Sequence, residues 1–342
     1  MNKRYKFEIA RVLSLLLVFP FFSACGGGSN IPPQEEIADA EQEEIASTEL
    51  IFNSGFEPGS TVLTNGEAAD VVGIDNSVSS PNDWVNDLDA HPNIGNFSIQ
   101  YEGGDDSMRI AEIIQDPTDP LNNVLHYWLE DPNVDGTKGR IQSNIYGNNN
   151  LTEFYQRVRV YLHEDWNILQ NSVGTFQWLT LFEFWNNAGW TGENYPFRIN
   201  INAEKRDSAE GSPLFFGINA ETKIGEYWSN LIWSEDNVNA PIPINQWLTI
   251  EIYMKEGAGG LGRFYMAMTP DGATKEVIFD ITNYTHHPDD RTPDGISHFN
   301  PMKLYTSNTL IDHVRANNGV LQVYWDDFEL WKGDGLVEII NL

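Results

Sequence analysis

Short segments in which apolar and polar residues alternate dominate the sequence beyond residue 50, and this pattern most constrains the fold. Because alternate residues of a strand point to opposite faces, each segment predicts a strand with one buried face. Clusters of Gly, Asn, Asp and Pro separate the segments, as expected of turns. One short helix is expected over 308–316, and no long stretch has a helical period. The pattern therefore predicts an all-β fold, a β-sandwich or jelly roll. The clearest predicted strands are 139–146, 153–162, 175–185, 196–204, 214–219, 247–255, 262–269, 275–281, 301–306 and 320–331.

The first 50 residues are expected to lie outside this fold. Residues 1–24 combine a basic start, an apolar run and small residues, which is typical of an export signal. The only cysteine, Cys25, directly follows Phe22-Ser23-Ala24, which resembles a bacterial lipoprotein signal in which the cysteine carries the lipid. The alternative is an ordinary secretory signal with an incidental cysteine. Residues 25–50 hold seven acids and no base, and they predict a flexible tether. We expect a lipoprotein of a bacterial outer membrane, on the cell surface or the periplasmic side, held in the membrane by its lipid.

The charge of the chain excludes one class of partner. With 20 Lys and Arg against 50 Asp and Glu, the formal net charge is −30, whereas nucleic-acid binding needs a basic face. Residues 51–342 hold 16 bases and 42 acids, so a cluster of bases within them would stand out. No thiol follows Cys25, which excludes disulfides and cysteine catalysis in the folded part.

Several strand faces opposite the apolar ones carry Arg, Asn, Gln, Tyr and Trp instead of the acids common elsewhere. If these strands are neighbours in one sheet, their open face is a groove with cationic donors, amide donors and aromatic platforms. Such a groove suits a polysaccharide, including one with carboxylate or sulfate groups, because Arg matches these anions. The alternative is that the arginines pair with acids on an ordinary surface. The candidate groove residues are Arg140, Gln142, Asn144, Tyr155, Arg157, Arg159, Gln177, Glu183, Trp185, Arg198, Asn200, Lys303 and Tyr305.

Some of these segments resemble a known family. The stretch 153–166, EFYQRVRVYLHEDW, is similar to an aromatic strand of the concanavalin A-like jelly-roll polysaccharide lyases, the alginate-lyase and heparin-lyase-like group. The order of the segments 138–142, 176–178, 245–250 and 302–305 also resembles that group. The resemblance implies cleavage of an acidic, uronate-containing glycan by β-elimination.

The roles of individual residues follow from the same resemblance. Arg140 and Gln177 would neutralise the substrate carboxylate, Tyr305 would act as base or acid, and Lys303 would lie near the substrate anion. The sequence departs from the family at Leu179, where the family has a histidine. The Lys-to-Tyr spacing is also shorter. A base could instead come from one of the other histidines, His126, His163, His286, His287, His298 and His313.

The two ends of the folded part resemble the terminal strands of carbohydrate-active β-sandwiches, through Asn53–Glu57 and Tyr324–Trp331. In those proteins the two strands pair, and oxygen atoms from them often hold a structural calcium ion, because calcium prefers oxygen ligands. Glu57 and Asp326 would be its ligands, and no cofactor is expected for catalysis. The pairing implies one carbohydrate-active domain over 51–333, followed by a tail, 334–342. We expect a monomer.

Two other functions stay open. Glu183 lies between Phe182 and Phe184, and a carboxyl group in such surroundings could act as the acid of a glycoside hydrolase, with Glu204 as its partner. The same groove could also bind a surface glycan without cleaving it.

Overall fold

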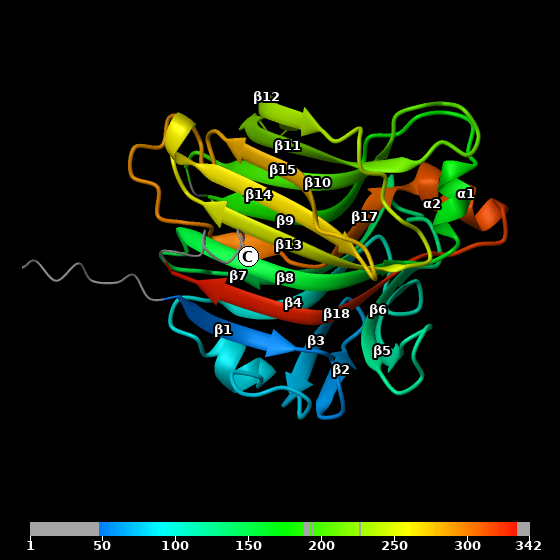
Figure 1. Cartoon of the computed structure of the whole chain (residues 1–342), viewed down its shortest axis with the longest axis horizontal. Helices are drawn as coiled ribbons and strands as arrows, with labels where there is room; N and C mark the ends of the chain where they lie inside the picture. Colours follow the sequence, from blue (N-terminus) through cyan, green and yellow to red (C-terminus); the bar gives the residue numbers. More distant parts are fainter. Residues whose placement is uncertain (1–47, 188–191, 193, 226, 334–342) are drawn as a thin grey trace, which may run out of the picture. The chain divides into compact units, whose positions relative to one another are not determined.

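Two antiparallel sheets form the framework of the computed structural model, which describes residues 48–187, 192, 194–225 and 227–333 (Figure 1). The predicted all-β sandwich is confirmed. The predicted signal peptide (1–24), the lipidation residue Cys25, most of the tether (25–50) and the tail (334–342) lie outside the described residues. In the part of the chain that is described, no helix is long and apolar enough to cross a bilayer.

One sheet has eight described strands and lies toward the viewer in Figure 1. Its central strands β8 and β18 pair along most of their length, and β1 pairs with the other edge of β18. The predicted pairing of the two ends of the folded part is therefore confirmed. The strands, in spatial order, are β15 (Glu276–Thr282), β14 (Arg263–Pro270), β13 (Trp247–Lys255), β8 (Glu153–Leu162), β18 (Leu321–Lys332), β6 (Asn123–Leu129) and β5 (Arg109–Gln115), with β1 (Glu49–Ser54) beside β18.

The other sheet has ten described strands. Its middle is irregular, because two short strands, β16 and β17, follow one another between β9 and β7 and pair with both. In spatial order the strands are β12 (Tyr227–Asp236), β11 (Leu214–Ile224), β10 (Phe197–Lys205), β9 (Leu179–Asn186), β16 (His298–Asn300), β7 (Lys138–Tyr146), β4 (Asn96–Glu102), β3 (Ala68–Gly73) and β2 (Ser60–Thr64), with β17 (Lys303–Ser307) in line with β16.

The apolar faces of the two sheets meet in the core. On β8 the inward residues Phe154, Val158 and Val160 are buried, as the alternation predicts. The Phe154 ring lies 5.5 Å from the ring of Phe184 on β9, and the ring of Phe182 lies 5.7 Å from that of Trp325 on β18. Burying side chains of this size stabilises the fold by about 1.5–3 kcal/mol each. The core therefore fixes which face of each strand points outward.

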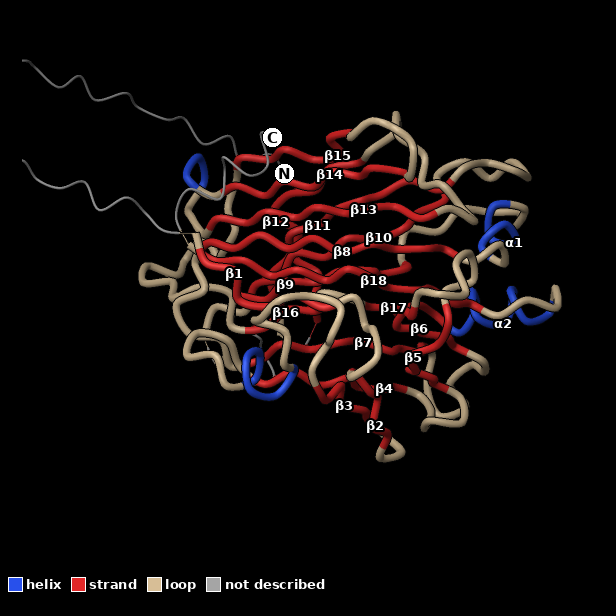
Figure 2. The backbone as a smooth tube through the Cα atoms, turned by 60° about the horizontal axis from the view of Figure 1, so that its bottom comes forward, coloured by secondary structure: helices blue, strands red, loops and turns tan. Residues whose placement is uncertain are grey.

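Helices are few and short among the described residues, and Figure 2 shows them at the ends of strands instead of over the sheets. The predicted helix over 308–316 is α2 (Asn308–Ala316). The others are α1 (Trp166–Gln170), the π-helix η1 (Trp84–Asp89) and the 3₁₀ helix η2 (Gly259–Leu261). Because they leave the sheets uncovered, the outer faces of the sheets are available for function.

Candidate active site in a groove of the ten-stranded sheet

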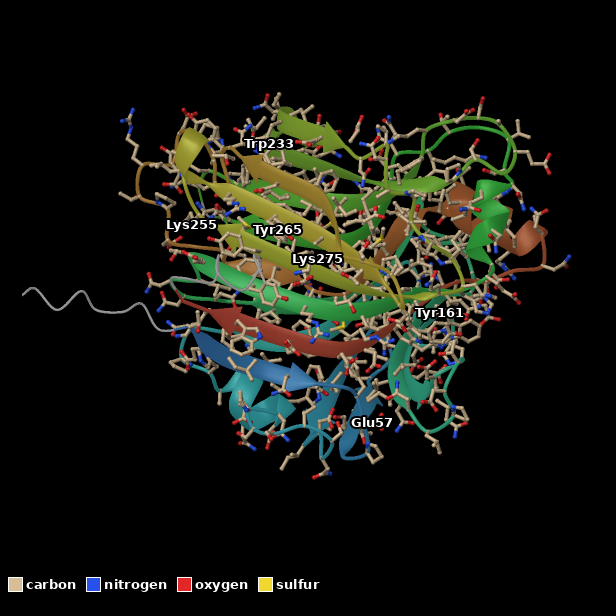
Figure 3. The ribbon with its side chains drawn as sticks, in the orientation of Figure 1. Glu57, Tyr161, Trp233, Lys255, Tyr265 and Lys275 are labelled. Carbon is tan, nitrogen blue, oxygen red and sulfur yellow. The ribbon has the colours of Figure 1, made fainter. Side chains whose placement is uncertain are left out.

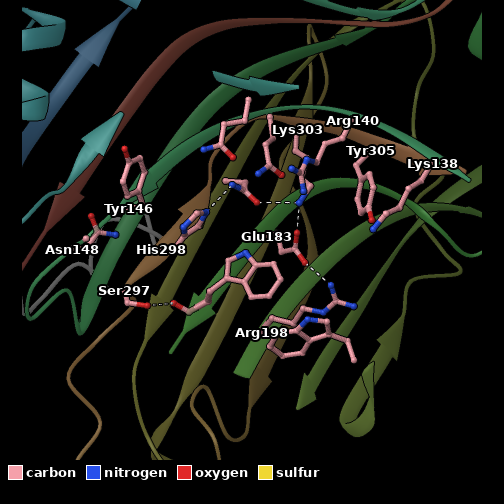
Figure 4. A pocket seen from close by; sticks show the side chains of 16 residues that line it. Lys138, Arg140, Tyr146, Asn148, Glu183, Arg198, Ser297, His298, Lys303 and Tyr305 are labelled. Carbon is pink, nitrogen blue, oxygen red and sulfur yellow. Dashed lines mark hydrogen bonds and ion pairs between the residues drawn. The ribbon is translucent and has the colours of Figure 1, made fainter. Parts of the chain in front are cut away.

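A groove of about 820 Å³ lies on the outer face of the ten-stranded sheet (Figure 4). Seven of the residues predicted from the sequence line it: Arg140, Gln142, Glu183, Trp185, Arg198, Lys303 and Tyr305. The predicted Asn144 and Asn200 are buried on the same face. Asn144 accepts a hydrogen bond from Gln142, and Asn200 donates one to Glu221. The other lining residues are Gln100, Lys138, Tyr146, Gly147, Asn148, Trp228, Ser297, His298 and Asn300.

The register of the strands brings these residues together. On β17, Lys303 lies opposite Gln142 of β7, and Tyr305 lies opposite Arg140. On the other side, Glu183 of β9 lies opposite both Asn200 of β10 and Asn300 of β16. Residues that are distant in the sequence therefore lie together in one patch. Their side chains point outward because of the alternation within each strand.

Three cations surround Tyr305 at one end of the groove. The Nζ atoms of Lys303 and Lys138 lie 5.0 and 5.3 Å from the centroid of the Tyr305 ring, and the Arg140 guanidinium lies 5.8 Å from it. The Trp178 ring makes an edge-to-face contact with the Tyr305 ring, with the centroids 5.0 Å apart. Burial raises the pKa of Tyr305, although Lys138 opposes the shift. The phenol is therefore protonated at neutral pH, and it lies among three cations whose charges are partly balanced by Glu102 and Glu183.

Glu183 occupies the middle of the groove floor. Its carboxylate accepts hydrogen bonds from the Lys303 ammonium and, at 2.9 Å, from Nη1 of Arg198. Burial alone would raise the pKa of Glu183, but the two cations outweigh it and hold the pKa below its usual range. Burial lowers the pKa of Lys303 to about 8; Glu183 opposes this shift and Arg140 adds to it.

His298 lies on the far side of Lys303 from Tyr305 (Figure 4). Its Nε2 is 3.1 Å from Oδ1 of Asn144, and Asn300 lies 3.3 Å from the same nitrogen. Burial and the nearby Lys303 lower the pKa of His298 to about 3, so the ring is neutral at pH 7. Of the six histidines considered as a base in place of Leu179, His298 is the one that lines the groove.

Two tryptophans form an aromatic platform at one side of the groove. The Trp185 and Trp228 rings lie 4.9 Å apart, nearly perpendicular, and the Arg198 guanidinium lies 4.9 Å from the Trp228 ring. Arg198 also pairs with Glu221 at 2.7 Å. With two carboxylates already bound, Arg198 serves to hold the platform more than to bind a further anion. Sugar rings stack on such aromatic faces.

Two buried side-chain atoms of β7 in the groove have no hydrogen-bond partner among the described residues. They are Nε of Arg140, a donor, and Oε1 of Gln142, an acceptor. Buried polar atoms nearly always have partners in folded proteins. Neither atom has accessible surface in this arrangement, so a glycan would supply a partner only if the side chains around it moved.

The predicted residues on β8 do not belong to the groove. Tyr155, Arg157 and Arg159 lie on the outer face of the eight-stranded sheet, the face that carries Tyr265 and Lys275 in Figure 3. Arg157 pairs with Glu329 at 3.0 Å and Arg159 with Asp271 at 2.7 Å. The prediction that these residues share a sheet face with Arg140 was wrong, because alternation within a strand does not reveal which sheet the strand joins.

Gln177 is also outside the groove, and it is exposed. The predicted strand 175–185 begins only at Leu179, and the register between β9 and β10 shifts after the Phe182–Ile201 pair. Because of this bulge Leu181 is buried in the core, and Thr180 points outward and donates to Asn202. Alternation therefore does not place Gln177, which precedes the strand, and Trp178 lies beside Tyr305 instead.

The two predicted calcium ligands lie at one end of the terminal strands, around Gly55. Glu57, labelled in Figure 3, accepts hydrogen bonds from the backbone and side-chain nitrogens of Asn123. Asp326 is buried and accepts from Asn122 at 2.9 Å, and burial beside Asp327 raises its pKa to about 7. The described residues contain no group of three or more His, Cys, Asp or Glu arranged to hold a metal. These acids supply oxygen ligands but not a complete ligand set, so calcium stays a prediction.

Comparison with known proteins gives a likeness of fold. A scan of family models and a search of curated proteins found no match. Similar solved structures include an endo-β-1,4-glucuronan lyase from the fungus Trichoderma reesei, 17% identical over 65% of this chain and 86% of that chain, with a TM-score of 0.40. A variant of alginate lyase Aly36B with bound alginate tetrasaccharide is 14% identical over 80% of this chain and 97% of that one (TM-score 0.41).

A third similar structure is the marine PL-14 alginate lyase from Aplysia kurodai, 11% identical over 82% of this chain and 98% of that chain, with a TM-score of 0.44. All three are polysaccharide lyases, the class that the sequence resembles. At these identities the likeness concerns the fold alone.

Proposed function

We propose that the groove binds an acidic, uronate-containing polysaccharide and cleaves it by β-elimination. The observation that carries this proposal is the Tyr305 cluster, in which a protonated phenol lies among Lys138, Arg140 and Lys303. β-Elimination needs cations to stabilise the negative charge that develops on the uronate and an acid for the leaving oxygen. The cluster supplies both within one patch.

The residues divide the reaction between them. Arg140, which lines the groove, would bind the carboxylate of the uronate. His298 would take the proton from the carbon next to that carboxylate. The electron pair of this C–H bond forms a carbon–carbon double bond, and the bond from the neighbouring carbon to the glycosidic oxygen breaks. Tyr305 would give its proton to that oxygen, and solvent returns the proton of His298 to Tyr305.

The placement of the two proton-transfer groups supports these roles. His298 and Tyr305 lie on opposite sides of Lys303, so a sugar above Lys303 would have a base on one side and an acid on the other (Figure 4). His298 is neutral, as a base must be, but a pKa of about 3 makes it a weak base in the free groove; the raised pKa of Tyr305 keeps its proton in place. A bound uronate would also raise the pKa of His298, because a nearby negative charge favours the imidazolium form.

Glycoside hydrolysis fits the groove less well. Its acid must hold a proton, but Lys303 and Arg198 keep Glu183 ionised. Its two carboxyl groups should be about 5–9.5 Å apart. Glu183 lies opposite Asn200, and Glu204 is four residues further along β10, a separation of about 13 Å along the strand. Glu204 packs over Gly217 and pairs with Arg206.

A panel of polysaccharides tests the proposal. β-Elimination of alginate-, ulvan-, glucuronan- or heparin-like polymers produces a conjugated double bond with new ultraviolet absorbance. Hydrolysis gives reducing ends without that absorbance. A glycan-binding protein without activity would be retarded in a gel that contains the polymer while leaving its length unchanged.

We also propose that the protein is a surface lipoprotein of a bacterial outer membrane. Support comes from the sequence alone, in which Cys25 follows a signal-like segment and precedes an acidic tether. In cells, Cys25→Ser should release the protein from the membrane fraction. Mass spectrometry of the N-terminal peptide should show a lipid on Cys25, and an unmodified cysteine would contradict the proposal.

A further inference from the structure

Glu183 is the one acidic residue among the described residues that line the groove, which also holds the cations Lys138, Arg140, Arg198 and Lys303. Its side chain is 2% exposed, and the proposed reaction gives it no direct part. A buried charge is costly unless it is paired, so its partners indicate what it does.

The two partners of Glu183 come from different strands. Lys303 of β17, also 2% exposed, donates to one carboxylate oxygen, and Arg198 of β10 donates to the other. Arg198 has a second carboxylate, Glu221, but Glu183 is the one carboxylate within ion-pair distance of Lys303 among the described residues. The remaining hydrogen-bond partner of Lys303 is Asn300 at 3.0 Å, which is neutral.

Among the described residues, the other charged or titratable groups that face Lys303 are cations or neutral groups. Arg140 faces it from β7 and Arg198 from β10, and both are cations. His298 of β16 is neutral and lies close enough for Lys303 to lower its pKa, and the Tyr305 phenol follows on β17. Without Glu183, a buried ammonium would remain among cations and neutral groups.

We propose that Glu183 is a positioning residue that keeps Lys303 charged and holds it beneath the uronate, where the ammonium stabilises the anion formed on proton removal. This inference rests on the proposed function. Glu183, considered above as the acid of a hydrolase, here acts through Lys303 and does not touch the substrate.

The ionisation of Lys303 tests the inference without any glycan. Lysine labelled with ¹³C at Cε gives few signals, because residues 51–342 contain only seven lysines, and Lys303→Arg identifies the one that belongs to Lys303. In Glu183→Gln the titration midpoint of Lys303 should fall by at least about one pH unit, since a charge at ion-pair distance is removed. Glu183→Asp should restore part of the shift.

Glu204→Gln is the matched control. Glu204 is buried to a similar degree on the neighbouring strand β10, but it pairs with Arg206 outside the groove. This variant measures the general effect of replacing a buried carboxylate, and it should leave the Lys303 midpoint unchanged. An unchanged midpoint in Glu183→Gln, or an equal shift in Glu204→Gln, would overturn the inference.

Activity provides the second readout. On a polymer that the wild type cleaves, Glu183→Gln should lower kcat about five-fold or more at pH 8, because a midpoint that falls by one unit or more reduces the charged fraction of Lys303 from about one half to about one tenth or less. KM should change little. The ratio of variant to wild-type kcat should rise as the pH falls, because Lys303 regains its proton. A higher kcat in the variant would make neutral Lys303 the base and would overturn the inference. If the wild type cleaves no polymer, the proposed function fails, while the Lys303 midpoint still decides this inference.

Discussion

Lys303 and Tyr305 lie two residues apart on β17 and face the same groove, with Nζ of Lys303 5.0 Å from the centroid of the Tyr305 ring. β17 is only five residues long and pairs with both β7 and β9. One short strand therefore joins the cations of β7 to Glu183 of β9. This junction is why the anion-binding and proton-transfer groups of the proposed reaction meet in one place.

Arg140 and Arg157 should behave differently when replaced by Ala. Arg140 lines the groove, so Arg140→Ala should weaken binding of a uronate oligosaccharide about 10- to 100-fold, as for loss of a charged hydrogen bond. Arg157 lies on the other sheet and pairs with Glu329, so Arg157→Ala should leave the Kd unchanged. Isothermal titration calorimetry on both variants checks this. Equal losses would place the binding site elsewhere.

Glu102 should limit the affinity of the groove for anions. It pairs with Lys138 at 3.4 Å and with Arg140 at 3.2 Å, so a bound anion competes with it for both cations. In Glu102→Gln the affinity for uronate oligosaccharides should rise a few-fold at low salt, and the gain should shrink as salt screens it. Titrations at two salt concentrations measure this effect. Weaker binding in the variant would show that Glu102 orients the cations instead of competing for them.

His298 should make the folded state less stable in acid. Its pKa is about 3 in the folded protein and 6.5 as an ordinary value, so above pH 6.5 it is neutral in both states and has no effect. As the pH falls from 6.5 toward 3, the unfolded chain takes up a proton that the folded protein does not. The free energy of unfolding should then decrease by up to about 1.4 kcal/mol per pH unit from this group.

Urea unfolding at several pH values measures the contribution of His298. His298→Gln should show a shallower loss of stability between about pH 6 and pH 4 than the wild type. Parallel curves for the two proteins would mean that His298 is protonated in the folded state.

Calcium should stabilise the terminal strands if Glu57 and Asp326 bind it as predicted. At a calcium concentration about 100 times the Kd, Tm should rise by about 5 °C over the chelated protein. Asp326→Asn should remove the difference, whereas the exposed Asp280, which pairs with Arg263, is a control whose replacement by Asn should not. An identical Tm with EDTA and with calcium in the wild type would refute the predicted site.

Alternation predicted much of the fold and part of the groove. The strand 153–162 and the helix 308–316 have the predicted bounds, and Arg140, Gln142, Arg198 and Lys303 point outward as predicted. The strands before residue 130 alternate less clearly. β2 is five residues long with one buried residue, and β5 has a broken alternation, so neither shows a clear period of two.

The remaining groove residues depend on long-range geometry. Three features leave no local signal in the sequence. They are the sheet that β8 joins, the bulge that displaces Gln177 and the placement of Trp228 on an edge strand. His298 and Asn300 alternate in the sequence, but the break at Pro301 and Met302 concealed that they share a face with Lys303. Lys138, two residues before Arg140 on the same strand, could have been found by alternation alone.

Ultraviolet absorbance with uronate polymers, for the wild type and Tyr305→Phe, tests the central claim most directly. The wild type should produce the conjugated double bond, and the variant should do so at a rate about 100- to 10,000-fold lower, because it lacks the proton for the leaving oxygen. Its affinity for the polymer should stay similar, since Phe keeps the ring among the same cations. Absorbance that is equal in the two proteins, or reducing ends without absorbance in the wild type, would contradict β-elimination at Tyr305.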